Sequence, residues 1–337
     1  MTKKKILVLA TGGTIASQLS EEGLVPGLTI DQVISMVTGL NDIYDVTAKD
    51  ILNLDSSNIQ PEEWLYIAKK IDEEYSSYDG IVITHGTDTM GYTASALSYL
   101  LQGIPIPIVF TGSQLPVLHP LSDSIENLRC ALAFAATGHG GVFVAFNRKI
   151  ILGCRAVKVR TSNFDAFESV NAPVVASITS KGLEINADML PNTKGQPYKF
   201  YQEVNHQVFL IKLTPGFNPA IFDMLLEMNY KGIIIEAFGS GGIHFIHRDL
   251  VSKITKLSES GIAVVVTSQC LYEHSDLSVY QAGQMALKAG AIPAYDMTTE
   301  AAITKLMWAL SYTNTLQEVS DIFSTNYCGE INLLNSL

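Results

Sequence analysis

The sequence predicts an α/β protein of two domains: a larger N-terminal domain with a mainly parallel sheet covered by helices, and a smaller C-terminal α/β domain. The length of 337 residues exceeds the ~150 of a typical single domain. Short apolar runs alternate with amphipathic stretches, as expected for parallel strands joined by crossover helices. From about residue 188 to 203 the composition changes to Pro, Asn, Lys, Gly and Gln. We therefore set the domains at 1–190 and 206–337, with a linker at 191–205.

Four apolar runs in the first half predict buried strands. Their residues are mostly β-branched or leucine, and glycine or polar residues end each run. They cover residues 6–10, 80–85, 106–112 and 141–146. Amphipathic stretches between and beside them predict helices at residues 61–75, 90–101 and 124–136. The first of these stretches opens with Pro61 and two glutamates, which suit a helix N-terminus and its dipole.

The second half repeats this alternation on a smaller scale. Strands are expected at residues 207–213, 232–238 and 261–268. Helices are expected at residues 219–229, 248–260 and 299–310. This order predicts the second α/β unit.

The charge balance excludes several classes of partner. Lys and Arg total 22 against 33 Asp and Glu, which gives a net charge of −11. Nucleic-acid binding normally needs a basic surface, so we expect neither a nucleic acid nor an acidic membrane as partner. Only 16% of the residues are charged, below the usual ~25%, which favours surface buried between subunits.

The chain start and the cysteines indicate a cytoplasmic protein. Three lysines precede an apolar run of residues 6–10, which is too short for the ~7–15 residues of a signal-peptide core. An 18-residue apolar stretch, as a membrane span would need, is lacking. The four cysteines lie far apart without a CxxC pair, so we expect reduced thiols and neither disulfides nor a zinc site. They are Cys130, Cys154, Cys270 and Cys328.

Polar residues follow four strands of the predicted N-terminal sheet. These segments are residues 11–14, 55–58, 84–89 and 111–114, rich in Thr, Ser and Gly. Each alone is as well explained by turn formation, but ligands of open parallel sheets bind at the carboxyl ends of the strands. A threonine hydroxyl becomes a nucleophile only when a neighbouring base activates it. Asp88 could hold a cation or a substrate ammonium, and Lys158 is the best-placed lysine to move a proton.

Two of these segments resemble the signatures of a known family. TGGTIA at 11–16 and HGTDTM at 85–90 are similar to those of the bacterial-type L-asparaginases, a family of threonine amidohydrolases. The resemblance extends over essentially the whole chain. It includes DSS at 55–57, TGS at 111–113 and RAVK at 155–158. Within the family, this chain most resembles the cytoplasmic type I branch, because of its DSS segment, its length and the expected lack of a signal peptide.

The resemblance implies hydrolysis of L-asparagine to L-aspartate and ammonia, without cofactor or metal. It makes Thr14 the nucleophile that forms a β-aspartyl ester, although the family leaves room for Thr87 in that role. Thr87, Lys158 and Asp88 form a second set that moves protons and activates water. The resemblance also implies a homotetramer, built as a dimer of dimers.

The same resemblance implies the substrate contacts. Ser56 and Ser57, with the backbone at Asp55, would hold the α-carboxylate of the substrate. Asp88 would bind its α-ammonium. Backbone N–H groups near Thr87 and Ser113 would stabilise the oxyanion.

The segment after the nucleophile departs from the family pattern. Many members have a tyrosine there, whereas this chain has Leu24 at the matching position. A leucine excludes water but moves no proton. We expect Tyr280, from the smaller domain of a partner subunit, to take the place of the missing tyrosine. Tyr272 and Tyr295 are alternative candidates, and packing at a subunit interface explains Tyr280 equally well.

Two further hypotheses stay open, and a third is set aside. The first is a mixed glutaminase–asparaginase, because one methylene changes binding by only ~1–3 kcal/mol. The second is a non-catalytic asparagine-binding protein, although the four catalytic residues together speak against it. The third is a metal at His244 and His247, whose spacing suits a metal on a helix, but a third ligand is missing and we favour a surface or interface role.

Overall fold

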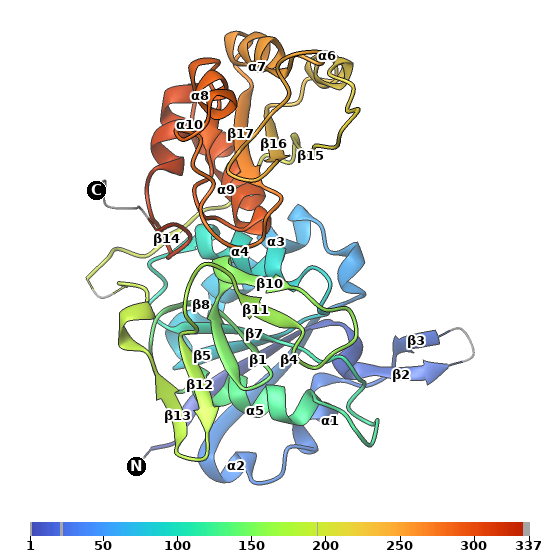
Figure 1. Ribbon diagram of the computed structural model, residues 1–337. Coiled ribbons are helices and arrows are strands. Elements are labelled where there is room, and N and C mark those ends of the chain that lie inside the picture. Colours follow the sequence, from blue (N-terminus) through green and yellow to red (C-terminus); the bar gives the residue numbers. More distant parts are fainter. Residues whose placement is uncertain (1, 21–22, 194, 333–337) are drawn as a thin grey trace. The chain divides into compact units, whose positions relative to one another are not determined.

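The computed structural model describes residues 2–20, 23–193 and 195–332, and it divides the chain into two compact units (Figure 1). The first unit comprises Met1–Gln202 and the second Glu203–Leu337. Each unit contains its own sheet and helices, which confirms the predicted α/β class with a larger and a smaller part. Residues 199–200, within the expected linker, form the short strand β14 (Lys199–Phe200), which pairs with β6 (Leu101–Gln102) in the first unit.

The first unit is built on an eight-stranded sheet in the order β13-β12-β9-β8-β7-β5-β1-β4. Neighbouring strands are parallel from β8 to β4 and antiparallel from β8 to β13. The strands are β1 (Lys4–Gly12), β4 (Tyr44–Leu54), β5 (Gly80–Thr84), β7 (Pro107–Thr111), β8 (Gly141–Phe146), β9 (Lys149–Leu152), β12 (Ala176–Thr179) and β13 (Gly182–Ile185). The antiparallel extension was not anticipated from the sequence.

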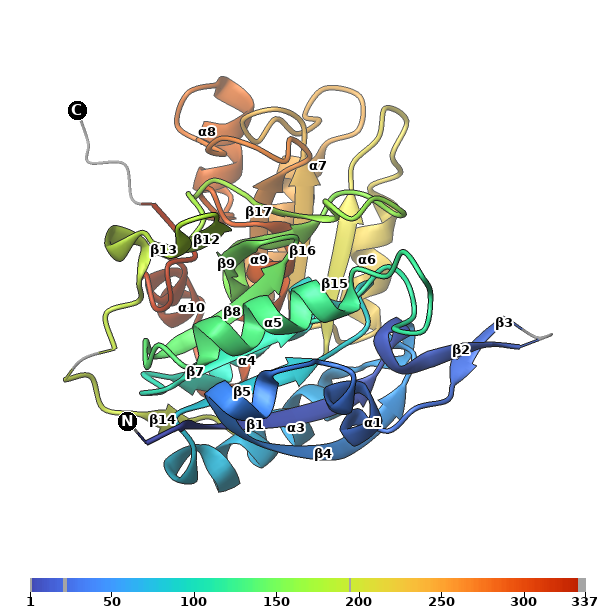
Figure 2. The same ribbon diagram turned by 90° about the horizontal axis from the view of Figure 1, so that it is seen from below.

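Helices cover this sheet, as expected. Helix α5 (Ser124–Ala135) packs against β5, β7 and β8, and α4 (Met90–Leu100) packs against β8 and α3 (Pro61–Glu74) (Figure 2). The remaining elements are α1 (Ile30–Ser35), α2 (Leu40–Ile43), and the antiparallel pairs β2 (Ser17–Ser20) with β3 (Gly23–Pro26) and β10 (Ala156–Lys158) with β11 (Phe167–Ser169). The strands β1, β5, β7 and β8 are buried along nearly their full length, which explains their continuous apolar runs.

The second unit has a four-stranded parallel sheet in the order β15-β16-β17-β18. The strands are β15 (Val208–Lys212), β16 (Gly232–Ala237), β17 (Ala263–Ser268) and β18 (Ile292–Pro293). The helices are α6 (Ala220–Glu227), α7 (Leu250–Glu259), α8 (Gln281–Lys288), α9 (Thr299–Tyr312) and α10 (Leu316–Phe323). All strands and helices expected from the sequence are present in the two units, with ends shifted by at most two residues.

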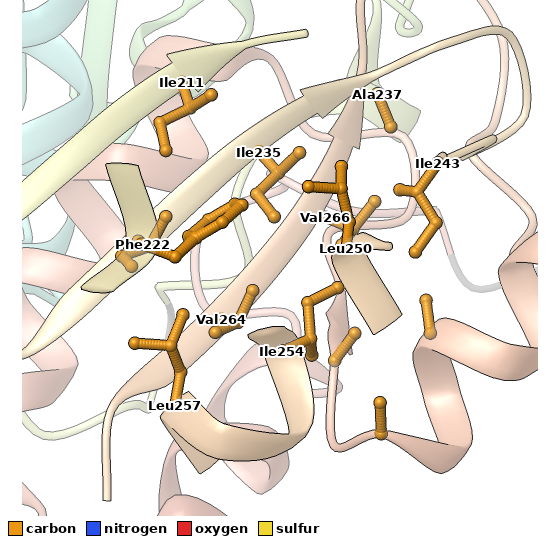
Figure 3. Close-up of a cluster of buried hydrophobic side chains, with 14 of the residues drawn as sticks. Ile211, Phe222, Ile235, Ala237, Ile243, Leu250, Ile254, Leu257, Val264 and Val266 are labelled. Carbon is orange, nitrogen blue, oxygen red and sulfur yellow. The ribbon is translucent and has the colours of Figure 1, made fainter. Parts of the chain in front are cut away.

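An apolar cluster holds one layer of the second unit together. Side chains of α6 and α7 meet those of the central strands β16 and β17 (Figure 3). Phe222 on α6 is 1% exposed, and Leu250 and Ile254 on α7 are fully buried against Val264 and Val266. Burial of side chains of this size contributes about 1.5–3 kcal/mol each to the stability of this layer.

Candidate active site

The turn after β1 brings two of the sequence motifs together. Gly13 has φ of +86°, and a Cβ added there would lie 2.5 Å from the backbone N of Gly86. A side chain therefore cannot be accommodated, and the backbone of the first motif lies directly against that of the second. Thr14, half-buried at the start of a short 3-10 helix, follows Gly13, just as Thr87 follows Gly86.

The DSS segment is tied to the same place. A Cβ at Gly86 would lie 2.6 Å from Oγ of Ser56, which is 3% exposed. The backbone N–H of Asp88 donates to Ser56 Oγ (3.3 Å), and the hydroxyl of Thr89 donates to the Ser56 carbonyl (2.7 Å). The strands β5, β1 and β4 are neighbours in the sheet (Figure 2). The segments that follow their carboxyl ends therefore meet at Gly86, at the edge where open parallel sheets bind ligands.

Lys158 connects the hydroxyl and the carboxylate of the second motif. It ends β10, and its Nζ donates to Thr87 Oγ1 at 2.7 Å and to Asp88 Oδ1 at 2.6 Å. The lysine side chain is 18% exposed and that of Asp88 is 62% exposed. The family resemblance grouped Lys158 with Thr87 and Asp88, although no spacing along the chain links them, and the structure shows the contact itself.

This arrangement supports proton transfer. A lysine amine within hydrogen-bond distance of a hydroxyl is the geometry that general acid–base catalysis needs. Asp88 balances the ammonium charge of Lys158 on one side, and its large exposed fraction leaves oxygen lone pairs open for a cationic ligand.

The remaining predicted binding residues have partners inside the chain. The Asp55 carboxylate accepts from Ser57 N (2.8 Å) and Ser57 Oγ (2.5 Å), and these hydrogen bonds hold the pKa of Asp55 below its ordinary value. Ser113 is 2% exposed and donates its hydroxyl to the Leu115 carbonyl at 2.7 Å. Ser56 differs, because its oxygen accepts from Asp88 and its own proton takes no part in that bond.

His85 lies beneath the second motif and is fully buried within the fold. Its Nδ1 is 2.7 Å from the Gly86 carbonyl and its Nε2 is 3.0 Å from Thr93 Oγ1. Burial in apolar surroundings lowers the pKa of His85 to about 4, so the ring is neutral near pH 7. With both ring nitrogens engaged, His85 supports the motif and is not placed as a base.

Gln114 joins the site, although the sequence suggested no role for it. Its Oε1 accepts from Thr87 Oγ1 at 3.5 Å, while its Nε2 donates to the carbonyls of Thr161 (3.2 Å) and Asn163 (2.9 Å). Its position after the TGS segment, at the end of β7, was the only signal in the sequence.

Tyr280, which we expect to replace the tyrosine that other family members have at the position of Leu24, belongs to the second unit. Tyr280 precedes α8 and is 66% exposed, and its rival Tyr272 is 48% exposed. Tyr295, the other rival, is partly buried, and this burial raises the pKa of its phenol. Leu24 lies in β3, and its side chain falls outside the described residues. The role of Tyr280 stays a prediction.

The described residues contain no group of three or more His, Cys, Asp and Glu that could hold a metal ion. His244 and His247 lie in the loop before α7, not on a helix, and His244 Nε2 is 3.1 Å from the Thr214 carbonyl. In that same part of the chain, no helix is long and apolar enough to cross a membrane.

The fold and the site define an amidohydrolase of the asparaginase family. Residues 5–191 match the family model described as Asparaginase, N-terminal, and residues 207–323 match the Glutaminase/Asparaginase C-terminal domain. The chain belongs to this family.

Three relatives illustrate the similarity. The L-asparaginase of Thermococcus kodakarensis is 44% identical over 97% of this chain and 99% of its own, and its solved structure has a TM-score of 0.92. A probable cytoplasmic L-asparaginase from Campylobacter jejuni is 30% identical, with a TM-score of 0.83 over 96% of this chain and all of its own. One subunit of the glutamyl-tRNA(Gln) amidotransferase of Pyrococcus furiosus is 38% identical over 97% of this chain and 76% of that protein.

Proposed function

We propose that the protein hydrolyses the side-chain amide of L-asparagine to L-aspartate and ammonia, with Thr14 as nucleophile. The single observation that carries the proposal is the contact of Lys158 Nζ with both Thr87 Oγ1 (2.7 Å) and Asp88 Oδ1 (2.6 Å). The close approach of the Gly13 and Gly86 backbones supports it, because Thr14 follows Gly13 directly and Thr87 follows Gly86 directly.

The first half of the proposed reaction forms an ester. Thr14 Oγ attacks the amide carbon, its proton passes to the leaving nitrogen, and ammonia departs when the C–N bond breaks. Backbone N–H groups near Thr87 and Ser113 stabilise the oxyanion, a contribution of about 3–4 kcal/mol per donor in other amide hydrolases.

The second half releases the product. With Lys158 in its neutral form, water passes one proton to the Lys158 amine through the Thr87 hydroxyl while its oxygen attacks the β-aspartyl ester. The proton then returns to Thr14 Oγ as the ester C–O bond breaks. Splitting the reaction in this way replaces one difficult step by two easier ones. The reaction consumes one water and needs neither metal nor cofactor.

The substrate is held by its α-groups in this proposal. The exposed Asp88 carboxylate binds the α-ammonium, and Ser56, Ser57 and the backbone at Asp55 bind the α-carboxylate. The proton of Ser56 can serve this purpose because its oxygen, not its proton, engages Asp88. Both the hydroxyl and the backbone N–H of Ser57 donate to Asp55, so Ser57 would have to turn from Asp55 to bind the substrate.

The alternative function is a mixed glutaminase–asparaginase, and selectivity between asparagine and glutamine distinguishes the two. Identity is higher to the L-asparaginase of Thermococcus kodakarensis (44%) than to the amidotransferase relative of Pyrococcus furiosus (38%), which favours asparagine. Ammonia release should be measured with L-asparagine and L-glutamine over a range of concentrations. Comparable kcat/KM for both would establish the mixed activity, and release from neither would refute the proposal.

We further propose a cytoplasmic homotetramer arranged as a dimer of dimers. The charged fraction of 16% supports extensive subunit burial, and a relative bears the description cytoplasmic. Light scattering after size-exclusion chromatography should give four times the 36.7 kDa of one chain. A mass of 36.7 kDa would exclude any site completed by a partner subunit, including the proposed role of Tyr280.

A further inference from the structure

Gln114 stands where three parts of the candidate site meet. Its side chain reaches from the end of β7 to the Thr87 hydroxyl, and to the carbonyls of Thr161 and Asn163 in the loop that follows Lys158. The amide of Gln114 thus contacts the Thr87 hydroxyl, which accepts a hydrogen bond from Lys158, and it fixes the segment that carries this lysine.

The partners decide which way the amide points. Backbone carbonyls only accept hydrogen bonds, so the NH₂ group must face Thr161 and Asn163. The carbonyl oxygen Oε1 is then left facing Thr87 Oγ1, at 3.5 Å.

The orientation of the Thr87 proton follows. When Lys158 is protonated, it donates to Thr87 Oγ1 at 2.7 Å and occupies a lone pair of that oxygen. The hydroxyl proton must then point to another acceptor, and Gln114 Oε1 is the one that the structure supplies among the described residues.

The backbone of Gln114 is itself held in place. The Asp123 carboxylate accepts from Gln114 N (3.1 Å) and Leu115 N (3.2 Å), and it also accepts from the amide of Asn127 at 2.9 Å. Asn127 donates in addition to the Gly112 carbonyl at 3.0 Å. A carboxylate and an amide from the loop and first turn of α5 thus fix the strand end that carries Gln114.

We infer that Gln114 is a positioning residue that directs the Thr87 hydroxyl proton and thereby sets the Lys158–Thr87 relay. The inference rests on the proposed function, since it assigns a role within that reaction. Gln114 acts through Thr87, whereas Asp88 and Ser56 hold the substrate. Removal of Gln114 should therefore slow turnover and leave binding nearly intact.

The test compares Gln114→Met with a matched control. Methionine preserves length and removes the hydrogen bonds of the amide. We expect kcat to fall about tenfold, as for a barrier raised by about 1.4 kcal/mol, with KM and aspartate affinity within threefold of wild type. Gln317→Met is the control, because Gln317 is exposed and makes its 2.8 Å hydrogen bond to Asp321 within helix α10. It should keep full kcat.

A second variant separates positioning from support of the fold. In a Thr87→Val background there is no hydroxyl to direct, so adding Gln114→Met should lower the residual single-turnover rate much less than the tenfold loss expected in the wild-type background. Full kcat in Gln114→Met would overturn the inference. Parallel losses of kcat, aspartate affinity and thermal stability would also overturn it, since they indicate only structural support. A wild-type enzyme that releases no ammonia from asparagine would instead refute the proposed function, before any variant is compared.

Discussion

Replacing Lys158 by methionine separates its part in turnover from its part in the fold. The variant keeps the length of the side chain but removes the ammonium that contacts Thr87 Oγ1 and Asp88 Oδ1. Asp88 is 62% exposed, so water replaces the lost partner and screening reduces the value of the ion pair. We expect the free energy of unfolding to fall by only about 1 kcal/mol.

The effect on catalysis should be far larger. Proton transfer by a positioned side chain contributes roughly 10²- to 10⁴-fold, so kcat of Lys158→Met should fall about 10³-fold, or ~4 kcal/mol of barrier. Isothermal titration with aspartate should show affinity within tenfold of wild type. Asp88→Asn is the informative comparison, because it should reduce both kcat and aspartate affinity. A Lys158→Met enzyme with kcat within tenfold of wild type would refute the reasoning.

Four further variants test other features. Burial keeps the pKa of His85 at about 4, against 6.5 in the unfolded chain, so the unfolded state binds the extra proton as the pH falls from 7 to 4. In urea unfolding over that pH range, the wild type should therefore lose about 3 kcal/mol more stability than His85→Gln. Equal losses would contradict this prediction. Glu330→Gln leaves the fully buried Lys305 ammonium without its counter-ion at 2.6 Å and should cost about 3–5 kcal/mol; a melting temperature equal to wild type would count against the pair. Tyr280→Phe should lower kcat at least tenfold with little loss of stability, and full kcat in this variant would show that the Tyr280 phenol takes no part in turnover. Leu24→Ala should instead raise KM.

The sequence predicted the parallel part of the fold well, because local patterns encode it. Buried parallel strands are continuous apolar runs, and the predicted helices show apolar residues at helical spacing, with α4 buried almost all round. The antiparallel strands β9, β12 and β13 have only four residues each, and β12 and β13 are partly exposed, so they lack a long apolar run. The strand β14 depends on pairing with β6, a tertiary contact that composition cannot reveal.

The candidate site divides in the same way. Thr14, Thr87 and Asp88 lie in strand-end motifs that can be recognised along the chain. The contact of Lys158 with Thr87 joins residues 71 positions apart, and only the fold brings them together. Gln114 was visible at a strand end, but its role depends on where the loop after Lys158 passes, which local sequence does not determine.

The most direct test of the proposed mechanism is to find where the acyl group resides during turnover. Enzyme mixed with L-asparagine should be quenched in acid within one turnover, digested, and its peptides analysed by mass spectrometry. We predict a mass increase of one aspartyl group on the peptide that contains Thr14, its absence in Thr14→Val, and ammonia release reduced by several orders of magnitude in that variant. The same adduct on the peptide that contains Thr87, or near-normal turnover by Thr14→Val, would contradict the assignment of Thr14 as nucleophile.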